Sequence, residues 1–348
     1  MNRDGSLLPV LIFPDLEQAG AGGAQGASGM AQHMITMRRG GVSSGIYATL
    51  NLSFGRGDDD ANVHENIRRV AAAFGTDEAH MVFSHQVHET NVLRVTAADA
   101  GMGVTRPMEW PSADGLVTNE PGLVLGAFFA DCVPLLFLDP VHRAVGVSHS
   151  GWRGTAGRIG RVTLEVMSRE FGTDPADVLV GIGPSICQDH YEVSEDVAAR
   201  FREEFPDGAE GAECADPGAG AAGIYAGEAG GEVRRTHPML RYAGRPGHMQ
   251  LDLWEACRVT LLEAGVPEEN IHVTDICTCC NPDLLFSHRA SHGRRGNIGA
   301  FIMLRYKSDF AKHRFEDQTT IAWPRFVTNV SSSSAARSPE KGFSPRTV

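Results

Sequence analysis

Three fragments of the sequence carry side chains that could bind a metal ion. Each places one such residue at or near the end of a predicted strand: His88, Cys132 and His149. Cys132 begins one apolar run and His149 ends the next, and a turn is predicted at residues 139–142 between them. A β-hairpin would therefore bring these two side chains together, and the segment with His88 could supply a third ligand.

Two imidazoles and one thiolate suit zinc, and three protein ligands leave the fourth tetrahedral position open for water or substrate. Copper is also compatible with two His and one Cys. We therefore expect His88, Cys132 and His149 to form one mononuclear metal site, with zinc as the expected ion. The spacing is not a local metal motif, so a structural role stays open, in which Cys132 is a small buried residue and each His is only hydrogen-bonded.

The same residues are compatible with covalent catalysis. Cys132 could be a nucleophile with His149 as its base and Asp131 or Asp114 as the orienting group, which would make the protein a cysteine hydrolase or amidase. A third class is a non-catalytic protein that zinc stabilises. The metal content of the protein distinguishes these classes.

The Gly-Trp-Arg-Gly segment at residues 151–154 stands between a strand and a predicted helix. Backbone N–H groups at a helix N-terminus and a guanidinium can bind an anion, so we expect Arg153, and secondarily Arg158, to contact phosphate. The structural alternative is that Arg153 pairs with a carboxylate while Trp152 fills the core. Residues 38–45 form a Gly-rich turn without the Lys of a P-loop, and an ordinary turn is favoured there.

The cysteines and the composition limit the class of protein. Seven cysteines, an odd number, argue against a disulfide framework. Residues 277–280 read Cys-Thr-Cys-Cys, but no partnering pair stands at ordinary spacing, which favours a structural role over a second zinc site. The formal charge of −12, without a basic cluster, argues against a nucleic-acid partner. The longest apolar run, residues 122–130, is too short to span a membrane, so we expect a cytoplasmic protein.

Apolar runs and helical spacing predict an α/β or α+β fold, a single domain of mixed β-sheets flanked by helices. We expect a flexible N-terminal extension at residues 1–30, a folded domain at 31–307 and a largely disordered tail at 308–348. A Gly/Ala-rich acidic stretch at about 206–231 reads as a surface insertion. The expected strands cover 34–38, 91–95, 123–129, 133–138, 144–149, 178–182, 271–275 and 300–304, and the expected helices cover 62–74, 155–171 and 251–264.

Several ordered motifs between residues 33 and 305 together resemble one family. They are Gly-Gly-Val-Ser at 40–43, Tyr-Ala-Thr-Leu-Asn-Leu at 47–52, Gln-Val-His at 86–88, Asp-Gly-Leu-Val-Thr at 114–118, Ala-Asp-Cys-Val-Pro at 130–134, His-Ser-Gly-Trp-Arg-Gly at 149–154, Ile-Gly-Pro-Ser-Ile at 182–186, Tyr-Glu-Val at 191–193, Asp-Ile-Cys-Thr at 275–278 and Phe-Ser-His-Arg at 286–289. The family is the multicopper polyphenol oxidase (laccase-like) family, whose members are also described as purine nucleoside phosphorylases.

The resemblance implies a single α/β domain with a zinc site at His88, Cys132 and His149. The implied substrates are phosphate and purine nucleosides, with phosphorolysis of adenosine, guanosine, inosine and methylthioadenosine to the free base and ribose 1-phosphate. Deamination of adenosine is implied as well. The laccase label implies copper-dependent phenol oxidation, which we treat as the weaker alternative because a multicopper oxidase needs many more copper ligands than these three.

In this interpretation Arg153 positions the phosphate, and the metal or an imidazole such as His85 stabilises the leaving base. Ser43 and Gln86 are expected to contact the ribose or the base. The chain departs from the family pattern near its C-terminal strand, where Ser-His-Arg at 287–289 and Arg-Gly-Asn at 295–297 stand in place of Ser-Tyr-Arg and Thr-Gly-Arg. Ser150 stands where Ala is usual.

Overall fold

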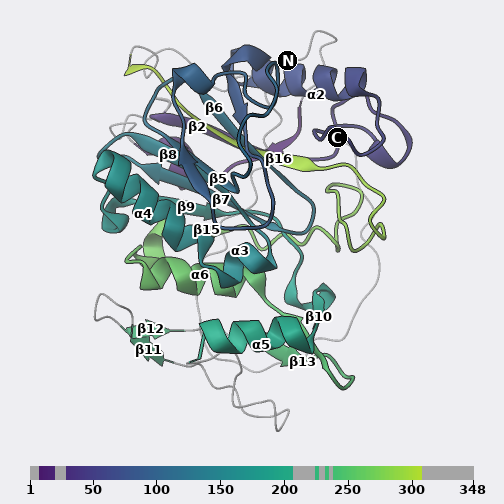
Figure 1. Ribbon diagram of the computed structural model, residues 1–348, viewed down its shortest axis with the longest axis vertical. Coiled ribbons are helices and arrows are strands. Elements are labelled where there is room, and N and C mark those ends of the chain that lie inside the picture. The colour runs from purple at the N-terminus through teal and green to yellow at the C-terminus, as the bar shows by residue number, and fades with distance from the viewer. Residues whose placement is uncertain (1–7, 20–28, 207–223, 227–231, 235–237, 308–348) are drawn as a thin grey trace, which may run out of the picture.

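Two β-sheets face each other at the centre of the protein in the computed structural model, which describes residues 8–19, 29–206, 224–226, 232–234 and 238–307 (Figure 1). One sheet has the strand order β1-β2-β16-β6-β3 and the other β15-β9-β7-β8-β5-β4. The bounds are β1 Val10–Leu11, β2 Ala31–Thr36, β3 Met81–Phe83, β4 Val92–Arg94, β5 Gly115–Thr118, β6 Val124–Phe129, β7 Val133–Asp139, β8 Ala144–Ser150, β9 Leu179–Ile182, β15 Ile271–Val273 and β16 Ile298–Leu304.

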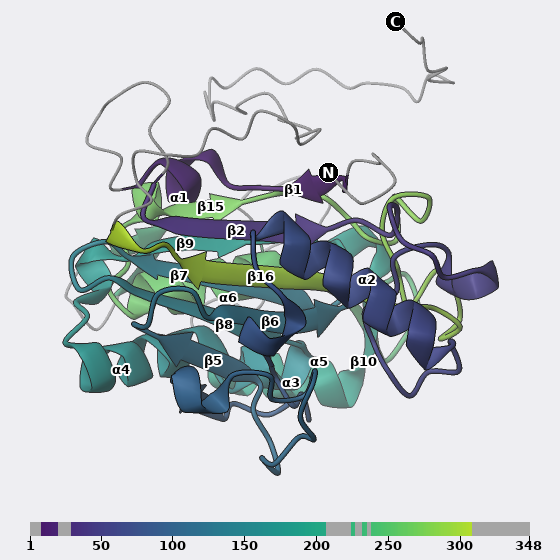
Figure 2. The ribbon, with the colours of Figure 1, turned by 90° about the horizontal axis from the view of Figure 1, so that it is seen from above.

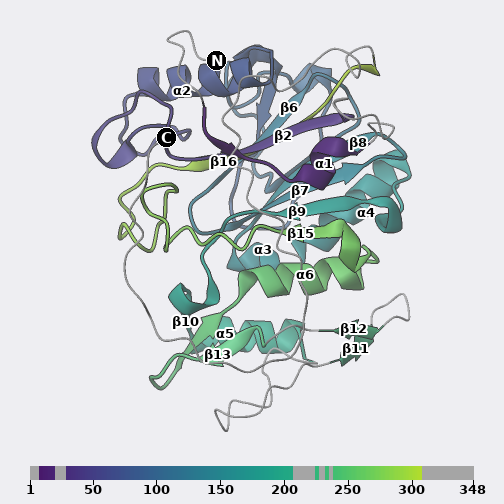
Figure 3. The same cartoon turned by 180° about the vertical axis from the view of Figure 1, so that it is seen from behind.

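Helices cover the outer face of each sheet, which gives a helix–sheet–sheet–helix arrangement (Figures 1 and 2). Helix α2 (Asp60–Ala73) packs on the five-stranded sheet, and α3 (Trp152–Ala156), α4 (Ile159–Phe171) and α6 (Leu253–Glu263) pack on the six-stranded sheet. Beyond α6 lie α5 (Glu195–Glu204) and a small sheet of β10 (Glu192–Ser194), β14 (His248–Leu251) and β13 (Leu240–Tyr242) (Figure 3). The remaining elements are α1 Pro14–Gln18, β11 Ile224–Ala226, β12 Glu232–Arg234 and the 3₁₀ turns η1 Gly45–Tyr47, η2 Glu78–His80, η3 Ala97–Asp99, η4 Pro175–Asp177, η5 Gln188–His190 and η7 Glu268–Asn270.

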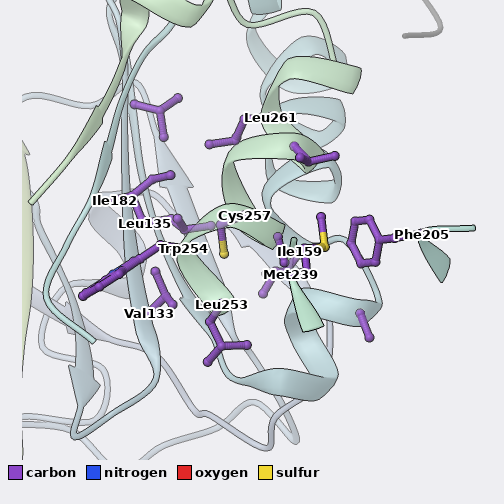
Figure 4. Packing of buried hydrophobic residues seen from close by; sticks show 14 of the residues in the cluster. Val133, Leu135, Ile159, Ile182, Phe205, Met239, Leu253, Trp254, Cys257 and Leu261 are labelled. Carbon is purple, nitrogen blue, oxygen red and sulfur yellow. The ribbon is translucent and has the colours of Figure 1, made fainter. Parts of the chain in front are cut away.

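The alternation of side chains along β7 shows how the layers are held together. Leu135 and Phe137 belong to the core under the helices, whereas Leu136 and Leu138 belong to the core between the two sheets. Successive residues of a strand point to opposite faces, and both faces of this strand are covered, which explains why its sequence is continuously apolar. On the helix side, Leu135 packs beside Cys257 of α6 (Figure 4).

The β7–β8 hairpin positions two of the candidate ligands. The strands are antiparallel, with Pro134 opposite His149 and Asp139 opposite Ala144 at the turn. Cys132 directly precedes β7, so the hairpin register places it at the same end of the sheet as His149. The expected hairpin is therefore present, and the expected mixed α/β fold is confirmed.

The expected strands and helices are all present, with shifted ends. The helix expected at 155–171 is divided into α3 and α4, because Arg158 adopts a left-handed conformation with φ of 59° between them. Strands such as β3 and β5 were not expected, since three or four residues are too few to show a periodic pattern.

The N-terminal region differs from the expected flexible extension. Residues 8–19 contain β1, which pairs with β2, and α1, whose Leu16 is fully buried together with Phe13 nearby. A two-residue strand is sufficient here because it adds to the edge of an existing sheet. Only β11 of the expected insertion at 206–231 and its first residue, Pro206, are described, and the tail at 308–348 lies outside the described residues. Within the described part of the chain, no helix has the length and apolar character needed to cross a membrane.

Candidate metal site

The structure brings His88, Cys132 and His149 together at one end of the two sheets. Their ligand-capable nitrogen and sulfur atoms all lie within 4.8 Å of one another. His88 follows β3 in a loop, Cys132 occupies the turn between β6 and β7, and His149 is the penultimate residue of β8. The two imidazole rings are nearly perpendicular, with centroids 4.8 Å apart. Three segments from different strands thus converge on one point.

Asp114, which directly precedes β5, orients two of these segments. Its carboxylate accepts the backbone N–H groups of Val87, His88 and Glu89, each at 3.0 Å. The same carboxylate lies 3.0 Å from Nδ1 of His149. Because an ionised carboxylate only accepts hydrogen bonds, Nδ1 carries the proton and Nε2 of His149 is left as the metal-binding nitrogen. Burial works to raise the pKa of Asp114, but hydrogen bonds from His149 and the backbone hold the pKa below its usual value.

Two residues of the site have left-handed backbone conformations, which cost free energy in any residue other than glycine. His88 has φ of 66° and Asp131 has φ of 88°. The bonds to Asp114 fix the His88 loop. Asp131 is held on three sides: its carbonyl accepts the N–H of Ile186, and its carboxylate accepts the hydroxyl of Thr278 and the N–H of Arg289. The surrounding contacts therefore hold the backbone in the conformation that directs the side chains of His88 and Cys132 into the cluster.

The electrostatics of the cluster favour a thiolate. Burial works to raise the pKa of Cys132, but the charge of His149 and hydrogen bonds from His149 and His88 lower it to about 6. Burial likewise works to lower the pKa of His149, but Cys132 and Asp114 raise it to about 9. The thiolate form is the one that binds metal ions and the one that acts as a nucleophile.

Space for an ion is provided by Gly151, the residue between β8 and α3. A Cβ atom at this position would lie 3.0 Å from Cδ2 of His88 and 3.2 Å from Sγ of Cys132. The φ of Gly151 is −74°, so space rather than backbone conformation requires glycine. His149 is buried, Cys132 is half-buried and His88 is exposed, which leaves the cluster open on the His88 side. The donor set, its orientation and this opening fit a three-ligand zinc site with one free position.

The expected phosphate residue lies close in sequence to the cluster and faces solvent. Arg153 is exposed, and its guanidinium lies 4.2 Å above the ring of Trp152. Among the described residues it makes no ion pair, so it is available to an anion. Arg158 instead pairs with Glu263 and donates to the carbonyl of Glu204, which is a structural role.

Ser43 and Gln86, the other expected substrate contacts, are engaged in bonds within the protein. Ser43 is buried, donates its hydroxyl to Asp58 at 2.6 Å and accepts from Asn66 at 2.9 Å. The amide of Gln86 exchanges two hydrogen bonds of 2.8 Å with the backbone of Phe128. His85 lies 2.6 Å from the carbonyl of Trp110 through Nδ1, so its Nε2 is the unprotonated nitrogen of the neutral ring.

An arginine beside the cluster was not among the expected site residues. Arg295 is half-buried, interacts electrostatically with Asp131 and Cys132, and leaves Nε without a hydrogen-bond partner. Burial and the charge of Arg56 lower its pKa to about 10, so it stays positively charged at neutral pH. The Arg-Gly-Asn segment at 295–297, which differs from the family pattern, was the available signal.

The Gly-rich turn at residues 38–45 contributes to a cavity of about 520 Å³. Three guanidiniums line this cavity, from Arg38, Arg39 and Arg69. All three donate to backbone carbonyls. Arg38 donates to Ala48 and Pro282, Arg39 donates to Asp283, and Arg69 donates to Gly40. These bonds hold the turn against neighbouring backbone, and the preference for an ordinary turn stays a prediction.

Comparison with known proteins now identifies the family. A family model described as "Multi-copper polyphenol oxidoreductase laccase" matches residues 32–305. The chain belongs to this family. It is 35% identical over 269 residues to "Purine nucleoside phosphorylase YlmD" of Geobacillus stearothermophilus, covering 77% of this chain and 88% of that protein. It is 33% identical to a "Purine nucleoside phosphorylase" of Bacteroides thetaiotaomicron, over 78% of this chain and 91% of that one.

A solved structure shares the fold. The crystal structure of YlmD from Geobacillus stearothermophilus superimposes with a TM-score of 0.67 and 34% sequence identity, covering 80% of this chain and 93% of that chain. The three segments that carry the cluster lie within residues 32–305, which the family model matches.

Proposed function

We propose that the protein is a cytoplasmic, zinc-dependent purine nucleoside phosphorylase. Its proposed substrates are phosphate and adenosine, guanosine, inosine or methylthioadenosine, and its products are the free base and ribose 1-phosphate. Adenosine deamination is proposed as a second activity of the same site. The observation that carries the proposal is the cluster of His88, Cys132 and His149 oriented by Asp114. The names of the relatives support the choice of reaction.

In phosphorolysis a phosphate oxygen forms a bond to C1′ of the ribose while the bond from C1′ to the purine nitrogen breaks. The electron pair of that bond goes to the purine, which leaves as an anion and takes up a proton. Catalysis thus requires a held phosphate and a stabilised leaving base. The proposal assigns the phosphate to Arg153, which makes no ion pair among the described residues. Arg295 adds a positive charge that acts on Cys132 of the cluster.

A zinc ion held by His88, Cys132 and His149 would supply Lewis-acid stabilisation of negative charge. The chain itself supplies the orientation. Asp114 keeps the Nδ1 proton on His149, so the ring presents Nε2 without a change of tautomer. His85 holds its Nδ1 against Trp110 and is the proposed contact for the leaving base, while Ser43 and Gln86 are the proposed contacts for ribose or base.

One observation favours a second candidate class, a cysteine hydrolase. Without a metal ion, the lowered pKa of Cys132 and the raised pKa of His149 describe the thiolate–imidazolium pair that such enzymes use. This class requires activity in the metal-free protein, whereas the phosphorylase requires the metal.

The proposal is tested by incubating the purified protein with adenosine, with and without phosphate, and separating adenine, inosine and hypoxanthine by chromatography. Adenine release that depends on phosphate supports phosphorolysis, and inosine formation without phosphate supports deamination. Cys132→Ala should abolish turnover and remove the metal ion held by His88, Cys132 and His149. Cys279→Ala, which changes a cysteine outside that cluster, should do neither. A Cys132→Ala protein that has lost the ion of this cluster and is still active would refute the proposal. A copper-dependent phenol oxidase assay tests the remaining alternative.

A further inference from the structure

A second group of metal-capable side chains lies outside the site already described. The ligand atoms of Cys187, His190, Cys277 and Cys280 all lie within 4.8 Å of one another. The three cysteines are free thiols. The sequence favoured a structural role for residues 277–280, because no partnering pair stands near them. The partner is a Cys-x-x-His pair, Cys187 and His190, which lies 90 residues earlier in the chain.

The spacing of these atoms matches a tetrahedral zinc site. With Zn–S of about 2.3 Å and Zn–N of about 2.0 Å, a sulfur and a nitrogen ligand of a tetrahedral site lie about 3.5 Å apart. In the structure, Nδ1 of His190 lies 3.2 Å from Sγ of Cys187 and 3.5 Å from Sγ of Cys280. The four atoms thus need only small shifts to surround one ion.

Backbone hydrogen bonds also fix the position of one sulfur of the cluster. Sγ of Cys277 accepts the N–H of Cys187 and the N–H of Cys280, each at 3.3 Å. One donor belongs to the turn of Cys277 itself and the other to the partner segment, so both halves of the cluster converge on this buried sulfur.

We propose that Cys187, His190, Cys277 and Cys280 bind one zinc ion as a closed structural site. Four protein ligands fill all tetrahedral positions, so the site leaves none for substrate, unlike the three-ligand cluster. Each thiol that binds gives up its proton to solvent. The proposal concerns folding and does not depend on which reaction the protein catalyses.

The position of this cluster indicates what the ion would stabilise. The segment with Cys187 donates to Asp131 through the N–H of Ile186, and the segment with Cys277 donates to Asp131 through the hydroxyl of Thr278. Asp131 directly precedes Cys132. An ion at the second cluster would therefore hold these two loops together. The loops fix the conformation of Asp131, and with it the turn that carries Cys132, a ligand of the first site.

Counting metal ions tests the proposal. The full-length protein, purified without chelators, should contain about two zinc ions per chain by elemental mass spectrometry. Cys280→Ser should lose one of them, and because Cys280 is exposed the substitution leaves no cavity in the core. Cys279→Ser changes a thiol of the same turn outside the cluster and should keep both ions. In cobalt-substituted protein, Cys132→Ser should show the thiolate-to-cobalt absorption of a three-sulfur site, and Cys280→Ser should lose most of that absorption.

A measurement on the unaltered protein makes the test independent of any variant. Cys187, Cys277 and Cys280 should resist alkylation until a chelator is added, as followed by peptide mass spectrometry. The proposal is overturned if the protein holds one ion whose number Cys280→Ser leaves unchanged, if these thiols react equally with and without chelator, or if two of them form a disulfide in zinc-replete protein. None of these results bears on phosphorolysis, which Cys132→Ala tests separately.

Discussion

The carboxylate of Asp114 and Nδ1 of His149 lie 3.0 Å apart, and both residues are buried. The same carboxylate accepts three consecutive backbone N–H groups from the loop that carries His88. One side chain thus sets both the tautomer of one ligand and the backbone around another.

Asp114→Asn should weaken metal binding by about 10- to 100-fold, because an amide nitrogen would face N–H donors or the proton of His149. The measurement is a zinc competition titration with a chromophoric chelator. Catalytic turnover should fall in parallel at limiting zinc and recover partly at high zinc.

Asp139→Asn is the matched control, since Asp139 makes the same kind of contacts at the opposite end of the hairpin. Its carboxylate accepts the N–H of Val141 and of His142 and lies 3.0 Å from Nδ1 of His142. This variant should lose stability without a change in zinc affinity. Equal zinc affinities of the two variants would contradict the role given to Asp114.

The sequence predicted those parts of the site that depend on neighbouring strands. Cys132 and His149 flank one hairpin, and a hairpin fixes its own register, so their proximity followed from two apolar runs and a turn. The second cluster could not be predicted this way. Cys187 and Cys277 meet because β9 and β15 run parallel and the bridge between Ser185 and Cys277 continues their pairing, a contact that no local pattern encodes.

The conformation of the loops could not be predicted from the sequence either. Arg158, near the start of a stretch with helical spacing, adopts a left-handed conformation that nothing in its residue type requires. Asp114 was recognisable only as a possible orienting group, because its three backbone donors come from the folding of the His88 loop. The burial of Ser43 could not be predicted either, because its partners Asp58 and Asn66 reach it only in the folded protein.

Gly151→Ala should lower zinc affinity by roughly tenfold, comparable to the loss of a supporting contact. The added Cβ would crowd Cys132 and His88 at 3.2 and 3.0 Å, although the backbone itself tolerates alanine. The same zinc competition titration measures this effect. Gly160→Ala is the control, because there the nearest atom is the end of the Leu261 side chain at 3.3 Å. If both substitutions leave zinc affinity unchanged, space at residue 151 is not limiting.

Ser43→Ala should lower the free energy of unfolding by about 1–3 kcal/mol, because Asp58 and Asn66 would lose a buried partner. Urea denaturation measures this loss. The KM for adenosine, determined on the folded variant at low temperature, then tests the proposed substrate contact. A raised KM would support the proposed substrate contact, whereas an unchanged KM would limit Ser43 to the hydrogen-bond network with Asp58 and Asn66.

Arg153→Ala should raise the KM for phosphate about tenfold or more, since hydrogen bonds to a charged group contribute about 1.5–3 kcal/mol. Steady-state kinetics with phosphate and adenosine varied separately provide the measurement, and the KM for adenosine should change less. Arg161→Ala, which removes a partly exposed arginine of α4 paired with Glu165, serves as the control. Equal effects on both substrates would show that Arg153 does not bind phosphate selectively.

The metal-free protein should be alkylated at Cys132 with a pH profile centred near 6. Below that pH the thiol is protonated and unreactive, whereas at pH 7 a pKa of about 6 gives roughly 90% thiolate, compared with about 1% for a pKa of 9. The rate of iodoacetamide labelling, followed by peptide mass spectrometry, should therefore rise up to about pH 7 and then level off. Burial raises the pKa of Cys257 to about 11, and burial together with neighbouring cysteines raises the pKa of Cys187 and Cys280, so these thiols should react more slowly.

Zinc should suppress this labelling of Cys132, and Cys132→Ser should eliminate it. A profile that keeps rising to pH 9 would show that His149 does not stabilise the thiolate. Protection by zinc combined with loss of turnover in the metal-free protein supports the phosphorylase. Full turnover in the metal-free protein, abolished by alkylation of Cys132, would instead identify a cysteine hydrolase. Such an enzyme needs only the nucleophilic thiolate and no metal ion.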